Sequence, residues 1–113
     1  MTMCRALSVM CVSVDRPSLQ ALKNAVVSAE WELTPGAVDE AEAMEQIEAE
    51  RPHVLVVFGA FPALLSMVRE RFPAMRIVTD RDTPEATAVA TSMAEVRGLV
   101  LGLPRSGGPV LGT

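Results

Sequence analysis

Residues 51–61 read Arg-Pro-His-Val-Leu-Val-Val-Phe-Gly-Ala-Phe, and this stretch decides the fold that the sequence predicts. Its centre, residues 54–58, is apolar without alternation and lies between Pro52 and Gly59. A short apolar run between turn-forming residues is typical of a strand buried on both faces, at the centre of a parallel sheet. Its last residue, Phe58, should face the carboxyl edge, where open α/β sheets keep their chemistry. A phenyl ring brings no acid, base or nucleophile to that edge.

Size and charge limit the classes of protein that fit. The chain has 113 residues, half of them apolar, and a mean hydropathy of +0.30, which suits one domain with one core. The net charge is −4, the pI is near 4.9 and no basic run occurs. Because phosphate binding needs clustered Lys and Arg, these values argue against a nucleic-acid platform. They predict a domain that does not bind nucleic acid, and we expect no membrane partner either.

The two cysteines, Cys4 and Cys11, form neither a redox motif nor a zinc half-site. Both are predicted to be reduced thiols, and Cys11 is predicted to lie in the core. Reduced thiols are typical of cytoplasmic proteins. The apolar run at residues 6–14 is too short to span a bilayer and has no signal-peptide cleavage pattern. We therefore interpret it as the first strand.

Strands and helices are predicted to alternate along the chain. The turn at residues 15–18 starts a first helix whose apolar face recurs every three or four residues up to Ala29. Thr83-Pro84-Glu85 has a hydroxyl, a proline and an acid in the order typical of a helix start, so a fourth helix is expected there, with Ala86, Val89, Ala90 and Met93 on one face. The predicted strands are 6–14, 31–34, 54–58, 75–79 and 99–103, and the second and third helices cover about 39–50 and 62–72. This alternation predicts a parallel sheet.

The second predicted helix has a thin apolar stripe, Ala41, Met44 and Ile47, and an otherwise acidic surface. That acidic side is either a solvated helix face or a docking surface for a basic partner. Trp31 is expected either to pack against the first or second helix or to be an exposed anchor at an interface. His53 is expected at the surface. Because it is the only histidine, no metal site built from several histidines is possible.

The order of these elements and the turn residues between them resemble the receiver domain of two-component response regulators, over nearly the whole chain up to Pro104. Residues 51–58 resemble that family's Arg-Pro-Asp-Leu-Val-Leu-Leu-Asp, and residues 14–17 resemble its Val-Asp-Asp-Glu-Pro. Residues 77–79 resemble its fourth strand, and residues 101–104 its Lys-Pro step. The resemblance implies a flavodoxin-like (CheY-like) three-layer α/β sandwich with a five-stranded parallel sheet in the order 2-1-3-4-5.

The residues that carry phosphorylation in that family are altered together. Phe58 stands where the resemblance implies the phosphate-accepting Asp, Leu103 stands where it implies the Lys, and Arg16 follows Asp15 where it implies a pair of acids. Thr79 keeps the hydroxyl group that the resemblance implies at the end of the fourth strand. Phosphoryl transfer needs a carboxylate nucleophile, oxygen ligands for Mg²⁺ and a cation for the developing charge. The prediction is a pseudo-receiver, with a degenerate pocket that includes Asp80, and no catalysis, cofactor or metal.

Alternatives remain for the carboxyl edge. Asp15, Asp80 and Asp82 either cap helices and solvate loops or form a residual cation or ligand site. Thr79 is either the ordinary end of a strand or part of a two-state switch. A small-molecule or nucleotide sensor that binds near Asp15, Gly59 and Asp80 is therefore the alternative to a protein-interaction domain. An enzyme of flavodoxin-like fold is the weakest alternative, because no nucleophile–base pair is evident.

No helical pattern follows Pro104, so the sequence predicts a domain at residues 1–104 and a tail or linker at 105–113. A fifth helix, which receivers place beside the first, is predicted to be missing. This would uncover a face formed by the fifth strand and helix 1, and exposed apolar surface of that kind marks interfaces. Either the chain is part of a longer regulator, or a protein partner, such as a second copy in a homodimer, covers this face. We expect a cytoplasmic, non-catalytic domain that acts by protein–protein contact.

Overall fold

The predicted three-layer α/β sandwich is confirmed in the computed structural model, which describes residues 7–28, 31–81 and 83–102. Five parallel strands form one sheet in the order β2-β1-β3-β4-β5. The strands are β1 (Leu7–Val12), β2 (Trp31–Leu33), β3 (Val54–Val57), β4 (Arg76–Thr79) and β5 (Ala88–Val89). The helices are α1 (Arg16–Val26), α2 (Glu40–Glu50), α3 (Pro62–Arg71) and α4 (Met93–Gly102).

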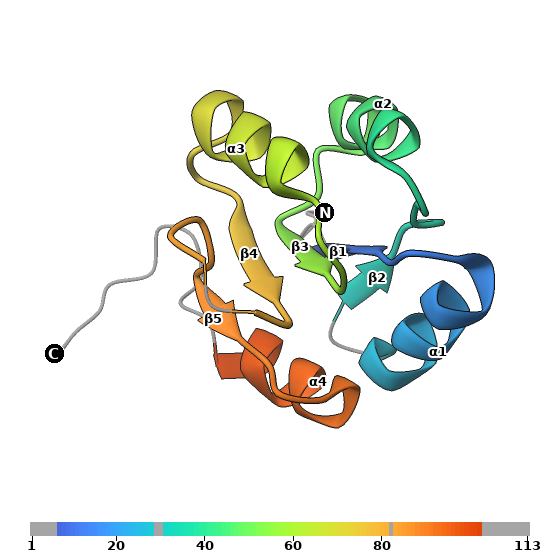
Figure 1. Ribbon diagram of the computed structural model, residues 1–113. Coiled ribbons are helices and arrows are strands. Elements are labelled where there is room, and N and C mark those ends of the chain that lie inside the picture. The colour runs from blue at the N-terminus through green and yellow to red at the C-terminus, as the bar shows by residue number, and fades with distance from the viewer. Residues whose placement is uncertain (1–6, 29–30, 82, 103–113) are drawn as a thin grey trace, which may run out of the picture.

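Two layers of helices cover the sheet, α2 and α3 on one face and α1 and α4 on the other (Figure 1). All four residues of β3 are buried, as expected for a central parallel strand. Successive side chains of a strand point to opposite faces, so Leu55 packs with the α2 and α3 side and Val56 with the α1 and α4 side. The unbroken apolar run of β3 therefore supplies both halves of the core.

Helix α1 begins where the sequence predicts. Asp15 is its N-cap, and the carboxylate accepts a hydrogen bond from the Ser18 N–H at 2.8 Å. Leu19, Leu22 and Val26 form the buried face, whereas Ala29 lies outside the described residues. Trp31 is buried, and its indole N–H donates to the Val26 carbonyl at 3.1 Å. Trp31 thus packs against α1, and the alternative of an exposed anchor is wrong.

The apolar stripe predicted for α2 is partly wrong. Ala43 and Ile47 are the buried residues of this helix, Met44 is half-buried and Ala41 is exposed. The sequence alone allows either Ala41 or Ala43 to face the core, depending on how the helix is rotated about its axis. Contact of α2 with the sheet and α3 selects the rotation that buries Ala43, which lies one turn before Ile47.

The predicted fourth helix and fifth strand are wrong. Residues around Val89 form β5 rather than a helix, because this segment pairs with the free edge of β4: Thr87 N–H donates to the Ile77 carbonyl at 2.7 Å and Ala90 N–H donates to the Thr79 carbonyl at 2.8 Å. The segment predicted as a strand at 99–103 instead lies largely in α4. A short apolar run without alternation fits a strand or a buried helix, and here α4 buries Val96 and Val100 against the sheet and α1.

The described chain has four helices, as predicted, but the missing helix is in another place. The described residues between β4 and β5, 80–81 and 83–87, contain no helix, and α4 follows β5 and packs beside α1. Arg97 of α4 donates to the Val27 carbonyl at 3.2 Å. The flank of helix 1 that was predicted to be uncovered is therefore covered by α4. Among the described residues, no helix is long and apolar enough to cross a membrane.

Candidate functional site at the carboxyl edge

Three chain segments meet at the carboxyl edge of the sheet because β1, β3 and β4 are parallel neighbours that end there. They are residues 13–16 after β1, residues 58–61 after β3 and residues 79–81 at the end of β4. Phe58 N–H donates to the Val12 carbonyl at 2.9 Å and continues the ladder one residue past β3. The structure therefore places the predicted site residues that it describes at one edge of the sheet. Leu103 and Asp82 lie outside the described residues.

The tip of β3 is apolar. Phe58 is half-buried and packs against the cluster on the α1 and α4 side of the sheet. Gly59 follows with φ +127°, a conformation that residues with a side chain rarely adopt. A Cβ on Gly59 would lie 2.7 Å from Val14 Cγ1 and 3.0 Å from the Phe61 ring, so these side chains enclose the glycine. The centre of the carboxyl edge is thus built from hydrophobic groups.

Asp15 and Arg16 serve the helices beside them. Hydrogen bonds from Ser18, mainly from its backbone N–H, hold the pKa of the exposed Asp15 carboxyl below its usual value. The capping role predicted for Asp15 is confirmed. The Arg16 guanidinium lies 3.2 Å from the Glu42 carboxylate and links α1 to α2. The other Glu42 oxygen accepts the Val38 N–H at 3.1 Å, which completes the N-terminal cap of α2.

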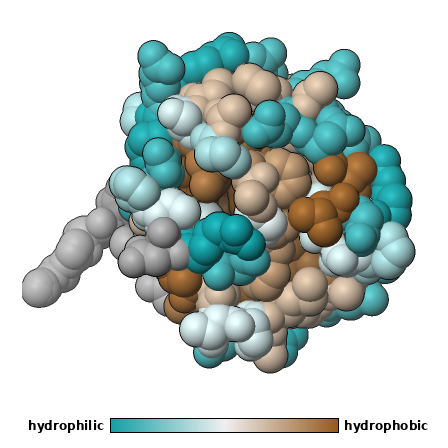
Figure 2. All heavy atoms as spheres, viewed as in Figure 1, coloured by the Kyte–Doolittle hydropathy of each residue, from teal (hydrophilic) through white to brown (hydrophobic). Residues whose placement is uncertain are grey.

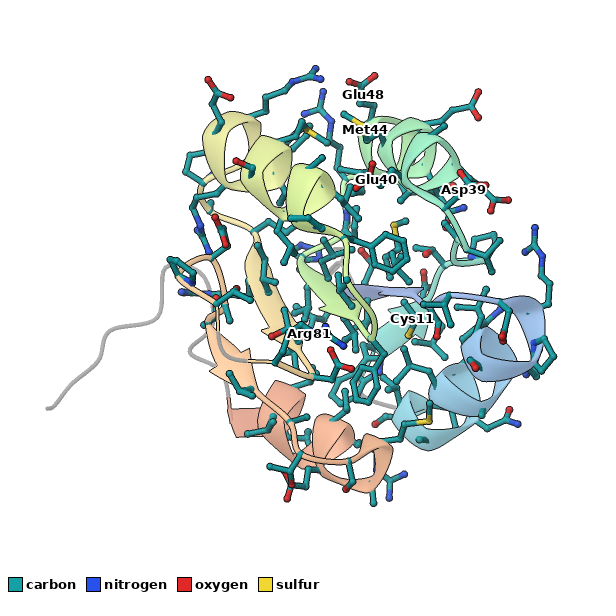
Figure 3. All side chains as sticks on the ribbon, viewed as in Figure 1. Cys11, Asp39, Glu40, Met44, Glu48 and Arg81 are labelled. Carbon is teal, nitrogen blue, oxygen red and sulfur yellow. The ribbon has the colours of Figure 1, made fainter. Side chains whose placement is uncertain are left out.

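Residues 79–81 close the edge on the other side. Thr79 is buried, and its hydroxyl donates to the Arg81 carbonyl at 2.5 Å. Thr79 therefore ends its strand and stabilises the following turn. The Asp80 carboxylate accepts the Gly59 N–H at 3.3 Å and lies 3.2 Å from the Arg81 guanidinium. In Figure 3, Arg81 lies near the middle of the view, just beyond the end of β4.

Other candidate groups lie away from this edge. The Cys11 thiol is buried, which raises its pKa to about 12 and keeps it protonated at neutral pH. His53 is exposed before β3, and its Nδ1 accepts the Ser8 N–H at 3.0 Å. Within the described ranges, no group of three or more His, Cys, Asp or Glu side chains is placed to hold a metal ion. The described edge residues offer apolar contact and hydrogen bonds.

A polar cavity of about 520 Å³ lies toward the opposite end of the sheet, beside the end of α2. The sequence did not indicate it, because its walls come from the starts of β1 and β3, the end of β2 and the end of α2, and no local motif links them. Among the residues that line it are Ser8, Thr34, Glu50, Arg51 and His53.

No protein-family model and no curated protein matches the sequence. Solved structures with a similar fold are repeatedly response regulator receiver domains. One is a CheY-like receiver domain protein from Methanospirillum hungatei, with 17% identity and a TM-score of 0.68, over 86% of this chain and 92% of that one. Another is the response regulator domain of Thermotoga maritima CheB, with 18% identity and a TM-score of 0.65, over the same shares.

The same fold occurs in a cobalamin-binding protein from Desulfitobacterium hafniense, with 8% identity and a TM-score of 0.63, over 86% of this chain and 58% of that one. At such identities the comparisons show the fold alone, and function has to be argued from the site. In its strand order and layers, this chain has the fold of CheY-like receiver domains.

Proposed function

We propose that this chain is a non-catalytic, receiver-like regulatory domain that acts through contact with a protein partner and is not phosphorylated on the usual aspartate. One observation carries the proposal: the residue at the end of β3 is Phe58, the position that the resemblance assigns to the phosphate acceptor. A phenyl ring neither attacks phosphorus nor coordinates a metal. We expect the domain in the cytoplasm.

The groups around Phe58 do not fit the Mg²⁺ ion that receiver phosphorylation requires. Magnesium needs several oxygen ligands in near-octahedral geometry. Asp15 caps α1, and Asp80 is already bonded to Gly59 and Arg81. Arg16, where the resemblance implies an acid, pairs with Glu42. The carboxylates of this edge are thus used to hold loops and helices in place.

The alternative, a small-molecule sensor at the carboxyl edge, has less support. Both carboxylates that the structure describes there, Asp15 and Asp80, have internal hydrogen-bond partners. The homodimer predicted through the face of the first helix and the strand expected at 99–103 has also lost part of its basis, because residues 99–102 lie in α4 and α4 packs on α1. A protein partner at another surface therefore remains the better proposal.

The test is phosphorylation itself. The full chain is incubated with acetyl phosphate and Mg²⁺, and in parallel with beryllofluoride and Mg²⁺, beside a receiver domain that is known to accept phosphate. We expect no mass increase and no saturable change in the amide NMR signals of Gly59, Thr79 and Asp80. A hydroxylamine-sensitive phosphoryl adduct, or beryllofluoride shifts confined to these residues, would show that the proposal is wrong.

A further inference from the structure

An exposed apolar patch lies at the carboxyl edge, formed by Val14, Phe58 and Ala60 around Gly59; we call it the edge patch. Val14 is 59% exposed, Ala60 is exposed and Phe58 is half-buried. We propose that the edge patch binds the apolar face of a basic amphipathic helix of a partner protein. This inference rests on the proposed function in one respect, the protein partner, and adds the surface and the chemistry of that partner.

Val14 is held at the surface by what lies beneath it. Its Cγ1 lies against Gly59, and the Phe61 ring lies beside the same glycine. The preceding residue, Ser13, is tied by its N–H to the Ala37 carbonyl at 3.1 Å. The valine side chain therefore rests on the β3–α3 loop and presents its outer side to solvent. A large apolar group in such a position gains from cover by a partner.

The charges around the edge patch indicate which sign of charge the partner should carry. Two helices that begin at this edge bring carboxylates with them: Asp15 before α1, and Asp39 and Glu40 at the start of α2. Among the residues that the structure describes, these three form no ion pair with a basic group. Figure 3 shows Asp39 and Glu40 at the start of α2.

The basic groups of the edge are already neutralised. Arg16 pairs with Glu42, and Arg81 pairs with Asp80. The edge therefore presents an apolar centre beside carboxylates that cap helices but pair with no basic side chain, and such a surface attracts a partner with Lys or Arg beside its apolar face. In the same view, Figure 2 shows hydrophobic surface in the middle of the visible face, with a strongly hydrophilic group directly to its left and further hydrophilic atoms above it and to its right, on the α2 side.

Geometry favours a helix as the bound segment. The strands end at this edge, so an extended peptide gains no ladder of backbone hydrogen bonds there. Contact has to come from side chains, and an amphipathic helix supplies an apolar row at i, i+3, i+4 and i+7. A second copy fits less well, because two acidic edges of a chain with net charge −4 repel each other. Anionic lipid is disfavoured for the same reason.

The first experiment uses a synthetic basic amphipathic peptide of leucine and lysine. Its control is a scrambled peptide of the same composition, whose leucines share no helical face. Binding to the full chain is measured by fluorescence anisotropy for the wild type, Val14→Ser and Val27→Ser. Val27 is a matched control, because it is also a valine, 53% exposed, at the other end of α1. We expect Val14→Ser to weaken binding about fivefold or more and Val27→Ser to change it less than about twofold.

The second experiment addresses charge. Glu40→Gln at the start of α2 is compared with Glu50→Gln at its end, because both remove one negative charge from the same helix. We expect Glu40→Gln alone to weaken binding of the leucine–lysine peptide, and amide NMR shifts on titration to centre on Val14, Phe58 and Ala60. A leucine–glutamate peptide of the same pattern should bind more weakly than the lysine peptide.

The proposal is overturned if the wild type does not bind the lysine peptide, if the scrambled or acidic peptide binds as tightly, or if Val14→Ser and Val27→Ser behave alike. It is also overturned if sedimentation velocity detects a dimer that Val14→Ser abolishes, or if phosphatidylserine vesicles bind the wild type but not that variant. Phosphorylation of the wild type would instead contradict the proposed function and leave the valine comparison interpretable, so the two failures are distinguishable.

Discussion

The carboxylate of Asp80 accepts a hydrogen bond from the backbone N–H of Gly59 across 3.3 Å, and this contact joins the end of β4 to the loop that follows β3. Asp80 also holds Arg81 in an ion pair at 3.2 Å. An acidic side chain at the carboxyl edge is thus used to fasten two loops. The contact is one reason why the β3–α3 loop keeps the conformation on which Val14 rests.

Removal of this contact should loosen the β3–α3 loop. We expect Asp80→Ala to lower the free energy of unfolding by about 1 kcal/mol and to speed amide hydrogen exchange at Gly59. Asp80→Asn keeps an acceptor oxygen, so its effect should be smaller. Urea unfolding and exchange measured by NMR give both values. Unchanged exchange at Gly59 in Asp80→Ala would show that the hydrogen bond does not hold the loop.

Two glycines should respond in opposite directions to alanine. Gly59 has φ +127°, and a Cβ there would lie 2.7 Å from Val14, so Gly59→Ala should destabilise the fold by about 2 kcal/mol. Gly98 lies inside α4, and a Cβ there meets no atom within 4 Å. Gly98→Ala should therefore stabilise the fold by roughly 1 kcal/mol. Thermal unfolding of both variants checks this, and shifts of the same sign would contradict it.

A carboxylate at position 58 should not create a metal site. Phe58→Asp loses apolar contact with the α1 and α4 side and puts a charge in its place, so we expect a loss of about 2 kcal/mol. Phe58→Leu, which stays apolar, should lose less. Urea unfolding with and without Mg²⁺ is the measurement. Stabilisation of Phe58→Asp by Mg²⁺, beyond any effect on the wild type, would reveal a latent metal site.

The Asp15 cap predicts a pH dependence in the acid range. Because hydrogen bonds from Ser18 lower the pKa of the folded carboxyl from its usual 3.8, the unfolded chain takes up the proton first as the pH falls. The stability from the charged cap is therefore complete above the unfolded pKa and is lost as the pH falls through the folded pKa. Asp15→Asn keeps a neutral cap, so its difference from the wild type should shrink below about pH 4. A difference that is independent of pH would contradict this.

Burial should protect Cys11 from alkylation. Its pKa is raised to about 12 by burial, so almost no thiolate is present in the folded chain at about pH 8. In a Cys4→Ser variant, which leaves Cys11 as the single thiol, iodoacetamide should react far more slowly in buffer than in urea. Mass spectrometry follows the reaction. Equal rates in both solvents would show that the core around β1 opens readily.

Local sequence patterns were sufficient for most of the fold. The unbroken apolar run of β3 marks a strand buried on both faces wherever it is placed in a sheet. Asp15 and Ser18 begin α1 through contacts three residues apart, and such local signals do not depend on the rest of the fold. The convergence of residues 15, 58 and 80 at one edge follows from parallel topology alone.

Contacts between segments far apart in the sequence were not predictable. The pairing of Arg16 with Glu42 and the bond from Gly59 to Asp80 depend on how loops meet after the sheet has formed. The exposure of Val14 was not predictable either. In the sequence Val14 continues an apolar strand and is expected to be buried, but in the structure β1 ends at Val12. The surface proposed for a partner therefore emerged only from the structure.

The sequence by itself determined the layers, the first four strands, the first three helices and the inert tip of β3, because each is encoded in periodicity and short-range capping. Only the tertiary structure decided the segment that contains β5 and α4. Residues near Val89 became β5 because β4 had a free edge to pair with, which outweighed the local helix signal at Thr83. The run near Val100 became α4 because the exposed side of α1 and the sheet had apolar surface to bury. Both choices depend on hydrogen bonds and apolar contacts that exist only once the other strands and helices are in place.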